Sequence, residues 1–337
     1  MSHATSPDTP RASAPEPLLR AVEVRQHFPV RRGFFKPTAY VKAVNGVSFE
    51  IAEGETFGLV GESGCGKSTL GRTLLRLVEP TDGACFYRGE NIFEKSPSEF
   101  ARFRRELQMV FQDPYSSLNP KMRVGDILEE AMKIHGIGTR RTRTDRVIEL
   151  LETVGLSSEH YFRFPHEFSG GQRQRIGLAR ALSLSPKVVI CDETVSALDV
   201  SIQAQVLNLM KRIRREFDLS YLFISHDLGV VKYISDRIGV MYLGNLVEVA
   251  TAEELFESPK HPYTQALISA LPKTNPRTKK ERIKLTGEVP SPLSPPSGCC
   301  FHTRCPHATE ICRTTVPASR TISDTHKVAC HLYEGRA

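Results

Sequence analysis

The sequence lacks long apolar runs, both along the chain and in its first residues. Its 337 residues include no stretch of the ~18 consecutive apolar residues that a bilayer-spanning helix requires. Residues 1–17 contain no apolar h-region, so we expect no export by a signal peptide. No internal repeat is visible either. Hydrophobic residues make up 40% of the chain and charged residues 25%, which is ordinary for globular proteins and excludes a mainly disordered chain.

Charge of one sign is in small excess, and cysteine is unevenly distributed. The net charge of +7 suits an anionic partner, such as a nucleotide, a nucleic acid or an anionic membrane surface, without choosing among them. Five of the eight cysteines lie between residues 299 and 330. An exported protein could pair such cysteines in disulfides, whereas a cytosolic one uses them as metal or cluster ligands.

Strand patterns and helix patterns alternate along most of the chain. The alternation predicts an α/β fold with a mainly parallel sheet covered by helices on both faces. Residues 1–17 are rich in Ser, Pro, Thr and Ala and are predicted to be a disordered tail. A basic and then Pro-rich stretch near 274–290 precedes a small Cys-rich module. Strands are predicted over 18–28, 41–51, 55–60, 187–191 and 219–225, and helices over 68–78, 201–217 and, with a break at 164–171, 140–183.

The octet Gly61–Ser68 fits the phosphate-loop pattern G-x-x-x-x-G-K-[ST], and it lies between a predicted strand and a predicted helix, as that motif must. Its glycines let backbone N–H groups close around phosphate oxygens, and the helix N-terminus adds about half a positive charge. Lys67 is expected to reach the β- and γ-phosphates and Ser68 to ligate Mg²⁺. Cys65 is interpreted as a small spacer. The predicted nucleotide-binding residues here are Gly61, Glu62, Ser63, Gly64, Cys65, Gly66, Lys67, Ser68 and Thr69.

A second candidate site is the apolar run Val188–Glu193, which ends in two carboxylates. The carboxyl end of such a strand lies beside the phosphate loop, where ligands of parallel sheets bind. Asp192 is expected to hold Mg²⁺, directly or through water, and Glu193 to activate the attacking water as general base. Any strand can end in Asp-Glu, and it is the phosphate loop that favours the functional interpretation.

Between these motifs lies the sequence Phe168–Gln172, which resembles the signature L-S-G-G-Q of ATP-binding cassette (ABC) ATPases with Phe in place of Leu. Ser196–Asp199 resembles the D-loop of that family, His226 its switch histidine and Gln112 its Q-loop glutamine. The order of the whole set removes the simpler interpretation of a turn followed by a helix cap. The resemblance covers about residues 18–272.

The resemblance implies a P-loop NTPase core with an antiparallel β subdomain and an α-helical signature subdomain. It divides the chain into a tail (1–17), an ATPase domain (18–273) with a helical subdomain at about 113–183, and a C-terminal extension (274–337). In that family two ATPase subunits face each other, and each ATP lies between the phosphate loop of one and the signature of the other.

The resemblance also implies roles for single residues. An aromatic ring is implied to stack on adenine, with Tyr40 as first choice and Phe28, Phe34 and Phe35 as rivals. The remaining roles are Lys67, Glu193 and His226 in catalysis, Ser68, Gln112 and Asp192 on Mg²⁺, and Ser169, Gly170, Gly171 and Gln172 on the nucleotide of the facing subunit.

The cysteines near the C-terminus follow the pattern C-x5-C-x6-C-x17-C. Together with the stretches 261–272 and 287–299, this pattern resembles the C-terminal extension of ATPase subunits from dipeptide and oligopeptide importers, some of which carry a [4Fe–4S] cluster. Four thiolates suit a cluster or Zn²⁺, and reduced, unligated thiols are a third alternative. Disulfides rank last in the reducing cytosol. The implied ligands are Cys299, Cys305, Cys312 and Cys330.

Two positions depart from the pattern of that subfamily. Cys300 stands where it usually has Arg, so five thiols compete for four places, and the spacing favours Cys299. Thr194 stands where it usually has Pro, and we expect little loss of hydrolysis. The neighbouring histidines are alternative Zn²⁺ ligands but are better explained as surface or packing residues: His302, His307, His326 and His331.

The sequence therefore predicts the ATPase subunit of an ABC importer for peptides or similar small solutes, at the cytoplasmic face of the membrane. Its expected partners are two permease subunits, a solute-binding protein and a second ATPase, commonly a non-identical sister. The transported solute stays open, because the permease and the binding protein choose it.

Two other functions compete with this prediction. One is a soluble ABC ATPase acting on nucleic acid or ribosomes, and the other is a redox sensor with ATPase activity as its output. The basic clusters at 140–143 and 277–280 lack interleaved aromatics, so solvated surface is the favoured interpretation and no nucleic acid is expected. The long coiled-coil insertion or second cassette usual in the first rival is also missing.

Overall fold

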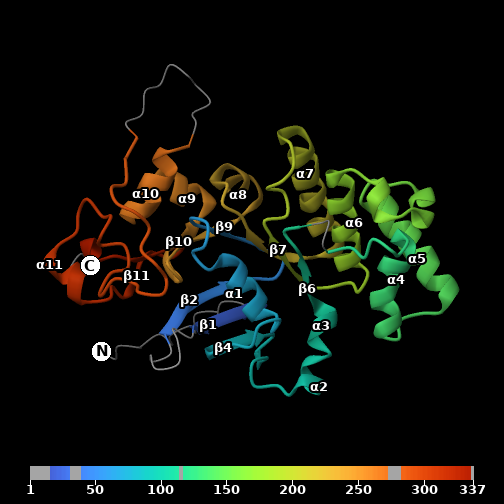
Figure 1. Cartoon of the computed structure of the whole chain (residues 1–337), viewed down its shortest axis with the longest axis horizontal. Helices are drawn as coiled ribbons and strands as arrows, with labels where there is room; N and C mark the ends of the chain where they lie inside the picture. Colours follow the sequence, from blue (N-terminus) through green and yellow to red (C-terminus); the bar gives the residue numbers. More distant parts are fainter. Residues whose placement is uncertain (1–15, 31–38, 114–116, 272–281, 335–337) are drawn as a thin grey trace, which may run out of the picture.

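The computed structural model describes residues 16–30, 39–113, 117–271 and 282–334 (Figure 1). Its strands form two sheets, and helices pack against them, which confirms the predicted α/β class. The main sheet has eight strands in the order β11-β12-β10-β9-β3-β8-β7-β6. Its strands are β3 (Thr56–Val60), β6 (Leu107–Val110), β7 (Val188–Asp192), β8 (Ser220–Ile224), β9 (Arg237–Tyr242), β10 (Asn245–Thr251), β11 (Ser319–Ser323) and β12 (His326–Ala329).

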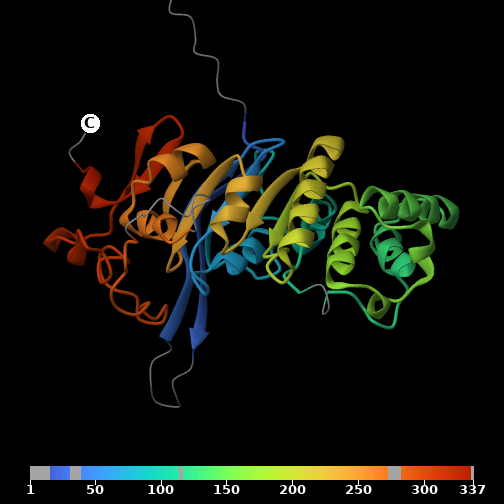
Figure 2. The same cartoon turned by 90° about the horizontal axis from the view of Figure 1, so that it is seen from above.

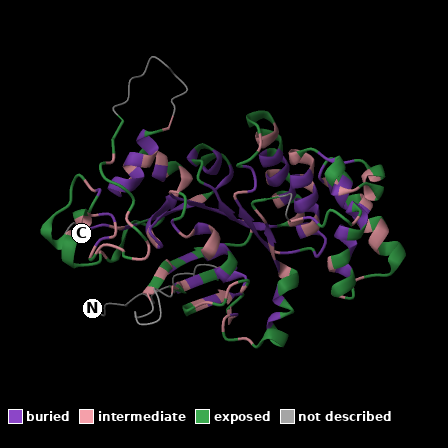
Figure 3. Ribbon diagram, in the orientation of Figure 1, coloured by how far each residue is buried: buried purple, intermediate pink, exposed green. Residues whose placement is uncertain are grey.

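The centre of the main sheet is parallel and fully buried. Strands β9, β3, β8, β7 and β6 are parallel neighbours, and every residue of β3, β7 and β8 is buried (Figure 3). Strands buried on both faces have continuous apolar sequences, which is why the predicted strands at 55–60, 187–191 and 219–225 are confirmed. The helices beside this part are α1 (Lys67–Leu74), α7 (Val200–Phe217) and α8 (Leu228–Ile234).

Helix α1 is shorter than predicted. The periodicity favoured a helix to residue 78, but the helix ends at Leu74. Leu75 is the C-cap, and Arg76 adopts a left-handed φ of 50°, which stops the helix. Helix α1 contacts β1 and β2 as well as β7 and β8, so it packs between the two sheets.

The second sheet is antiparallel, with the order β2-β1-β4-β5. Its long hairpin pairs Leu19 with Ile51 at one end and Val30 with Ala39 at the other. Phe49 of this sheet stacks on Phe57 of the main sheet with ring centroids 4.8 Å apart, so the two sheets share a core. The strands are β1 (Leu19–Val30), β2 (Ala39–Ile51), β4 (Asp82–Tyr87) and β5 (Glu90–Asn91), followed by the short helices α2 (Pro97–Phe100) and α3 (Phe103–Glu106).

A helical lobe extends from the β6–β7 side of the main sheet, at the right of Figures 1 and 2. It falls within the stretch predicted to be the helical subdomain, and its helices bury one apolar face each. Its elements are α4 (Val124–Ile134), α5 (Arg140–Thr153), the 3₁₀ turns Ser158–Phe162 and Pro165–Glu167, and α6 (Gly170–Leu182).

The C-terminal segment, residues 282–334, is continuous with the ATPase core. Strand β12 pairs antiparallel with β10, Glu248 opposite Val328 and Val249 opposite Lys327, so the hairpin β11–β12 extends the main sheet. The strands of the predicted small Cys-rich module therefore lie at the edge of the main sheet, next to β10. Its helix is α11 (Glu310–Thr314), and before it come α9 (Ala252–Glu257) and α10 (Pro262–Ser269). Among the described residues, no helix is long and apolar enough to cross a membrane.

Candidate functional site

The phosphate loop connects β3 to α1. Gly66 is the N-cap of α1 with a left-handed φ of 105°, and a Cβ there would lie 1.9 Å from the Ala43 carbonyl oxygen. Gly64 is left-handed as well, with φ 79°. No side chain caps the start of α1, so its first N–H groups point to a pocket of about 210 Å³. That pocket is lined by Val41, Ala43, Ser63, Gly64, Gly66, Lys67, Ser68, Thr69, Gln112, Glu193 and Pro292.

Lys67 and Ser68 connect the loop to its surroundings. The buried Lys67 ammonium donates to the carbonyl oxygens of Gly61 and Glu62, at 2.8 and 3.1 Å. The Ser68 hydroxyl donates to Oδ1 of Asp192 at 2.6 Å. Burial raises the pKa of the Asp192 carboxyl, and the Ser68 hydrogen bond opposes that shift. These contacts bring together two motifs 124 residues apart in the chain.

The pair Ser68–Asp192 fits a magnesium ion. Among the described residues, the buried Oδ2 of Asp192 accepts no hydrogen bond, and the Arg72 guanidinium lies 3.7 Å from it. A hydroxyl oxygen and a carboxylate oxygen without a hydrogen bond are ligands of the type that Mg²⁺ prefers. The side chain of Gln112, at the same pocket, offers a third oxygen.

Three polar side chains meet where neighbouring strands end. Gln112 follows β6, Glu193 follows β7 and His226 follows β8. The Gln112 amide donates to Oε2 of Glu193 at 2.9 Å, and Nδ1 of His226 lies 3.4 Å from the same oxygen. Glu193 itself adopts a left-handed φ of 47°, an uncommon conformation for a non-glycine residue that is typical of functional sites. The predicted water-activating carboxylate therefore lies between the predicted Q-loop and switch residues.

The signature lies elsewhere, at the start of α6 in the helical lobe. Ser169 is the N-cap, and its hydroxyl accepts from the N–H of Gln172 at 3.3 Å, while the Gln172 amide oxygen accepts from the Ser169 N–H at 3.0 Å. This is a capping box. The four signature residues Ser169, Gly170, Gly171 and Gln172 are absent from the lining of the phosphate pocket. The structure therefore does not bring the two glycine-rich motifs of one chain together.

The candidates for adenine stacking are only partly described. Tyr40, 52% exposed, lies at the start of β2 beside Val41, which lines the phosphate pocket. Phe28 is opposite Val41 in β1. Phe34 and Phe35 lie outside the described residues.

Sequence reasoning missed three contacts made by residues after position 260. The Glu62 carboxylate forms an ion pair with Arg304, and the Glu62 backbone N–H donates to the Tyr263 hydroxyl at 2.9 Å. Pro292 lines the phosphate pocket, and its carbonyl accepts from the Lys42 N–H at 3.3 Å. No local pattern signals these contacts, because Arg304 follows Glu62 by 242 residues.

The cysteines of the C-terminal segment divide into two groups. Burial raises the pKa of the Cys330 thiol to about 11. The Cys299 N–H donates to the Cys312 carbonyl at 2.8 Å, which joins the chain around two of the four predicted ligands. The Cys300 thiol points elsewhere and donates to the Tyr242 carbonyl at 3.8 Å. Among the described residues, no group of three or more His, Cys, Asp or Glu side chains is close enough to hold a metal ion.

The neighbouring histidines make other contacts. His302 Nδ1 lies 2.9 Å from the Cys299 carbonyl, His326 Nε2 lies 2.7 Å from the Glu248 carboxylate, and His331 Nε2 lies 2.9 Å from the Thr315 carbonyl. These contacts agree with the interpretation of packing residues. Of the basic clusters, 140–143 begins α5, and 277–280 lies outside the described residues.

Comparison with known proteins agrees with this geometry. Residues 44–196 match the ABC transporter family, and residues 247–312 match the C-terminal region of oligopeptide/dipeptide transporters. The chain is 53% identical to the oligopeptide transport ATP-binding protein AppF of Bacillus subtilis, over 96% of this chain and 99% of that protein. It is 52% identical to the dipeptide transport ATP-binding protein DppF of Escherichia coli, over 88% and 89% of the two chains.

Solved structures are similar in fold. CbiO1 of Clostridium perfringens, part of an ABC transporter complex, matches with a TM-score of 0.62 at 24% identity, over 72% of this chain and 91% of that one. A dimeric ATP-binding cassette with ADP and phosphate matches with a TM-score of 0.61 at 25% identity, over 69% and 98%. With relatives above 50% identity along nearly its whole length, this chain belongs to the family of ATP-binding subunits of oligopeptide and dipeptide ABC transporters.

Proposed function

We propose that this chain is the ATP-hydrolysing subunit of an importer for di- and oligopeptides, bound to its permease at the cytoplasmic face of the membrane. The observation that carries the proposal is the meeting of Gln112, Glu193 and His226 beside the phosphate loop. The names of the relatives, oligopeptide and dipeptide transport ATP-binding proteins, support peptides as the transported class.

Different residues of the pocket are proposed to bind the phosphates, to hold Mg²⁺ and to activate the attacking water. Backbone N–H groups of the loop and the start of α1 hold the phosphates, and Lys67 turns from the loop carbonyls to the β- and γ-phosphates. Ser68, Asp192 and Gln112 would hold Mg²⁺, which neutralises charge on the transferred phosphoryl group. Glu193 takes the proton of the attacking water, and His226, beside it, stabilises the charge that develops on the γ-phosphate.

A second ATPase subunit is needed to complete the site. The signature Ser169–Gln172 presents the start of α6, a 13-residue helix, away from the phosphate pocket of its own chain. It can meet a γ-phosphate only in a facing subunit, either a copy of this chain or a sister. The resemblance to a dimeric cassette supports this arrangement.

The permease is proposed to dock on the helical lobe. A groove of about 420 Å³ lies there, lined by Lys121, Met122, Arg123, Asp126, Glu130, Lys133 and Phe164. It combines an aromatic ring and a methionine with charges of both signs, which suits a short amphipathic helix. A solute-binding protein outside the membrane would deliver the peptide.

The substitution Glu193→Gln tests the catalytic assignment. It keeps the size of the side chain and removes the base, so ATP should still bind while turnover falls by about two orders of magnitude or more. ATP binding and phosphate release are measured on the same preparation with its permease. Undiminished turnover would refute the role of Glu193, and loss of ATP binding would show that it acts in binding instead.

We also propose a [4Fe–4S] cluster on Cys299, Cys305, Cys312 and Cys330, with Zn²⁺ as the alternative. The cysteine spacing and the 2.8 Å hydrogen bond from the Cys299 N–H to the Cys312 carbonyl support it, while the described side chains do not themselves form a metal-holding group. The Cys300 thiol, which donates to the Tyr242 carbonyl at 3.8 Å, is proposed to be the spare. One tetrahedral zinc ion would need the four sulfurs about 3.8 Å apart, given Zn–S bonds of ~2.3 Å. Iron and zinc analysis of anaerobically purified protein, with its visible absorption spectrum, distinguishes the two. Stable, active protein without either metal would refute the cluster.

A further inference from the structure

The C-terminal segment contacts the phosphate loop through an ion pair between Arg304 and Glu62. Both Nη atoms of Arg304 donate to the carboxylate of Glu62, at 2.8 and 3.2 Å. The Arg304 side chain is only 8% exposed and that of Glu62 27%. A two-pronged, shielded ion pair of this kind is stronger and more directional than the usual pair on a protein surface. Glu62 lies inside the phosphate loop, so the pair ties the C-terminal segment to the nucleotide site.

Aromatic packing fixes Arg304. Phe301 is fully buried, with its ring centroid 5.2 Å from that of Tyr242 and 5.4 Å from that of Tyr263. The Arg304 N–H donates to the Phe301 carbonyl at 3.0 Å, and Nη1 of Arg304 donates to the Tyr242 hydroxyl at 3.5 Å. The guanidinium is therefore positioned by a rigid cluster at the end of β9 and the start of α10.

Every polar group of Glu62 is engaged. Its N–H donates to the Tyr263 hydroxyl at 2.9 Å, its carbonyl accepts from Lys67 at 3.1 Å, and its carboxylate accepts from Arg304. When Lys67 turns to bound phosphates, it gives up the carbonyl of Glu62. The contacts with Arg304 and Tyr263 then remain to hold this part of the loop.

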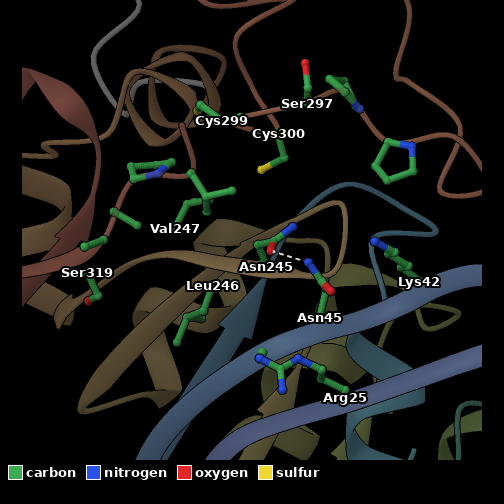
Figure 4. A pocket seen from close by; sticks show the side chains of 18 of the residues that line it. Arg25, Lys42, Asn45, Asn245, Leu246, Val247, Ser297, Cys299, Cys300 and Ser319 are labelled. Atoms are coloured by element: carbon green, nitrogen blue, oxygen red, sulfur yellow. Dashed lines mark hydrogen bonds between the residues drawn. The ribbon is translucent and has the colours of Figure 1, made fainter. Parts of the chain in front are cut away.

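The segment reaches the nucleotide site through separate contacts. A cavity of about 590 Å³ separates Cys299 and Cys300 from Lys42, Asn45 and Asn245 (Figure 4). Elsewhere the Pro292 carbonyl accepts from the Lys42 N–H at 3.3 Å. The Arg304–Glu62 pair is the contact that reaches a residue of the loop itself.

We propose that Arg304 is a positioning residue for ATP binding, which keeps the phosphate loop in its binding conformation through Glu62. The inference rests on the proposed ATPase function. A loop with three glycines has many alternative conformations and loses much entropy when a nucleotide orders it. An ion pair that orders it beforehand reduces this loss and so increases affinity.

The test measures ATP affinity of the full chain after substitution of Arg304. Arg304→Met keeps the length of the side chain and removes the charge, so the Kd for ATP with Mg²⁺ should rise about tenfold. Arg304→Lys should be intermediate, because an ammonium cannot make both bonds in the same geometry. Arg313→Met is the matched control, since Arg313 is 66% exposed and lies 3.8 Å from an exposed Glu310. Its Kd should equal that of the wild type.

A double-mutant cycle with Glu62→Gln separates positioning from general damage. If Arg304 acts through Glu62, the double variant should bind ATP no more weakly than Arg304→Met alone. In the assembled transporter, the KM for ATP should rise while turnover at saturating ATP changes less. If the circular dichroism spectrum of Arg304→Met differs from that of the wild type, the inference is tested by the ATP affinity of Glu62→Gln alone.

Three results have distinct meanings. Wild-type affinity in folded Arg304→Met, or in Glu62→Gln, overturns the inference. Additive losses in the double variant also overturn it, because the two residues would then act separately. A wild-type chain that does not bind ATP refutes the proposed function instead.

Discussion

The molecule has two glycine-rich helix starts, and they are built differently. At α1 the N-cap is Gly66, and no side chain occupies the free N–H groups. At α6 the N-cap is Ser169, whose hydroxyl and N–H are both bonded to Gln172. The first start is open toward a pocket in its own chain, whereas the second is closed by its own capping box. The difference suggests that α1 binds a nucleotide unaided, while the Ser169 hydroxyl must exchange partners when a facing subunit arrives.

The largest effect is expected when the start of α1 is altered so that its free N–H groups no longer face the pocket. In Gly66→Ala the new Cβ would lie 1.9 Å from the Ala43 carbonyl oxygen, at a left-handed φ. The loop must shift, so we expect the Kd for ATP to rise at least about a hundredfold. Titration of the full chain with ATP and Mg²⁺ measures this.

The control for that variant is Gly136→Ala in the helical lobe. Gly136 also has a left-handed φ, 65°, but nothing lies within 4 Å of a Cβ there. It carries a similar backbone strain, about 1–2 kcal/mol, without touching the pocket. Unchanged ATP affinity in Gly66→Ala, or an equal loss in Gly136→Ala, would contradict the role of the open start.

Acid should affect the support of the phosphate loop. Burial lowers the pKa of His261 to about 4, and the charge of Glu248 opposes that shift without overcoming it. His261 accepts from the Tyr263 N–H, and the Tyr263 hydroxyl accepts from Glu62, so this histidine supports the loop. Because the unfolded chain takes up this proton near pH 6.5 and the native state does not, stability is present above that pH and is lost as pH falls toward 4.

Between pH 7 and pH 5 this one group should lower the free energy of unfolding by about 2 kcal/mol. Urea denaturation at the two pH values measures it. His261→Asn keeps an acceptor at the N-cap of α10 and should show a smaller loss on acidification. His307→Asn, at an exposed position, is the control and should lose as much as the wild type. Equal losses in all three proteins would exclude His261 as the cause.

The smallest effect is expected at the closed helix start. Ser169→Ala removes the capping hydroxyl, which should cost about 1 kcal/mol of stability. Turnover of the assembled transporter should fall about tenfold, while the ATP affinity of the single chain stays unchanged. Phosphate release and ATP titration together measure this split.

Ser157→Ala is the matched control for that variant. Ser157 closes a capping box of the same kind in the same lobe, at the start of the 3₁₀ turn Ser158–Phe162 instead of at the signature. It should therefore lose similar stability and keep its turnover. A loss of ATP affinity in Ser169→Ala would remove the distinction between a start that binds alone and one that is completed by a partner.

Much of the phosphate loop and of the buried strands beside it was predictable from the sequence. The Gly61–Ser68 loop depends on contacts between near neighbours, and the buried strands are continuous apolar runs, so glycine spacing and hydrophobic pattern were sufficient to predict both. The place of Asp192 and Glu193 beside the phosphate loop followed from the position of a strand's carboxyl end, whereas the roles of Gln112 and His226 came only from the resemblance to ABC ATPases. The overlong helix at 68–78 was wrong because the left-handed Arg76 carries no signal in a helical pattern.

The contacts of the C-terminal segment with the rest of the chain were less predictable from the sequence. The sequence indicated four cysteine ligands and favoured Cys299 over Cys300, and this assignment stays a prediction. The sequence did not indicate that the strands of this module pair with the main sheet through β12 and β10. The basic and Pro-rich composition near 274–290 indicates an exposed linker. It does not indicate which strand the hairpin after it will pair with.

By itself, the sequence determined the local chemistry of this protein: a phosphate loop, a strand ending in two acids, a signature and a set of cysteines, in one order. The phosphate loop, the acidic strand end and the signature each depend on backbone geometry set within a few residues. Only the tertiary structure decided how these parts touch. The pair Arg304–Glu62 and the pairing of β12 with β10 join residues far apart in the chain. Such contacts form because packing in three dimensions makes them favourable, and no spacing along the chain encodes them.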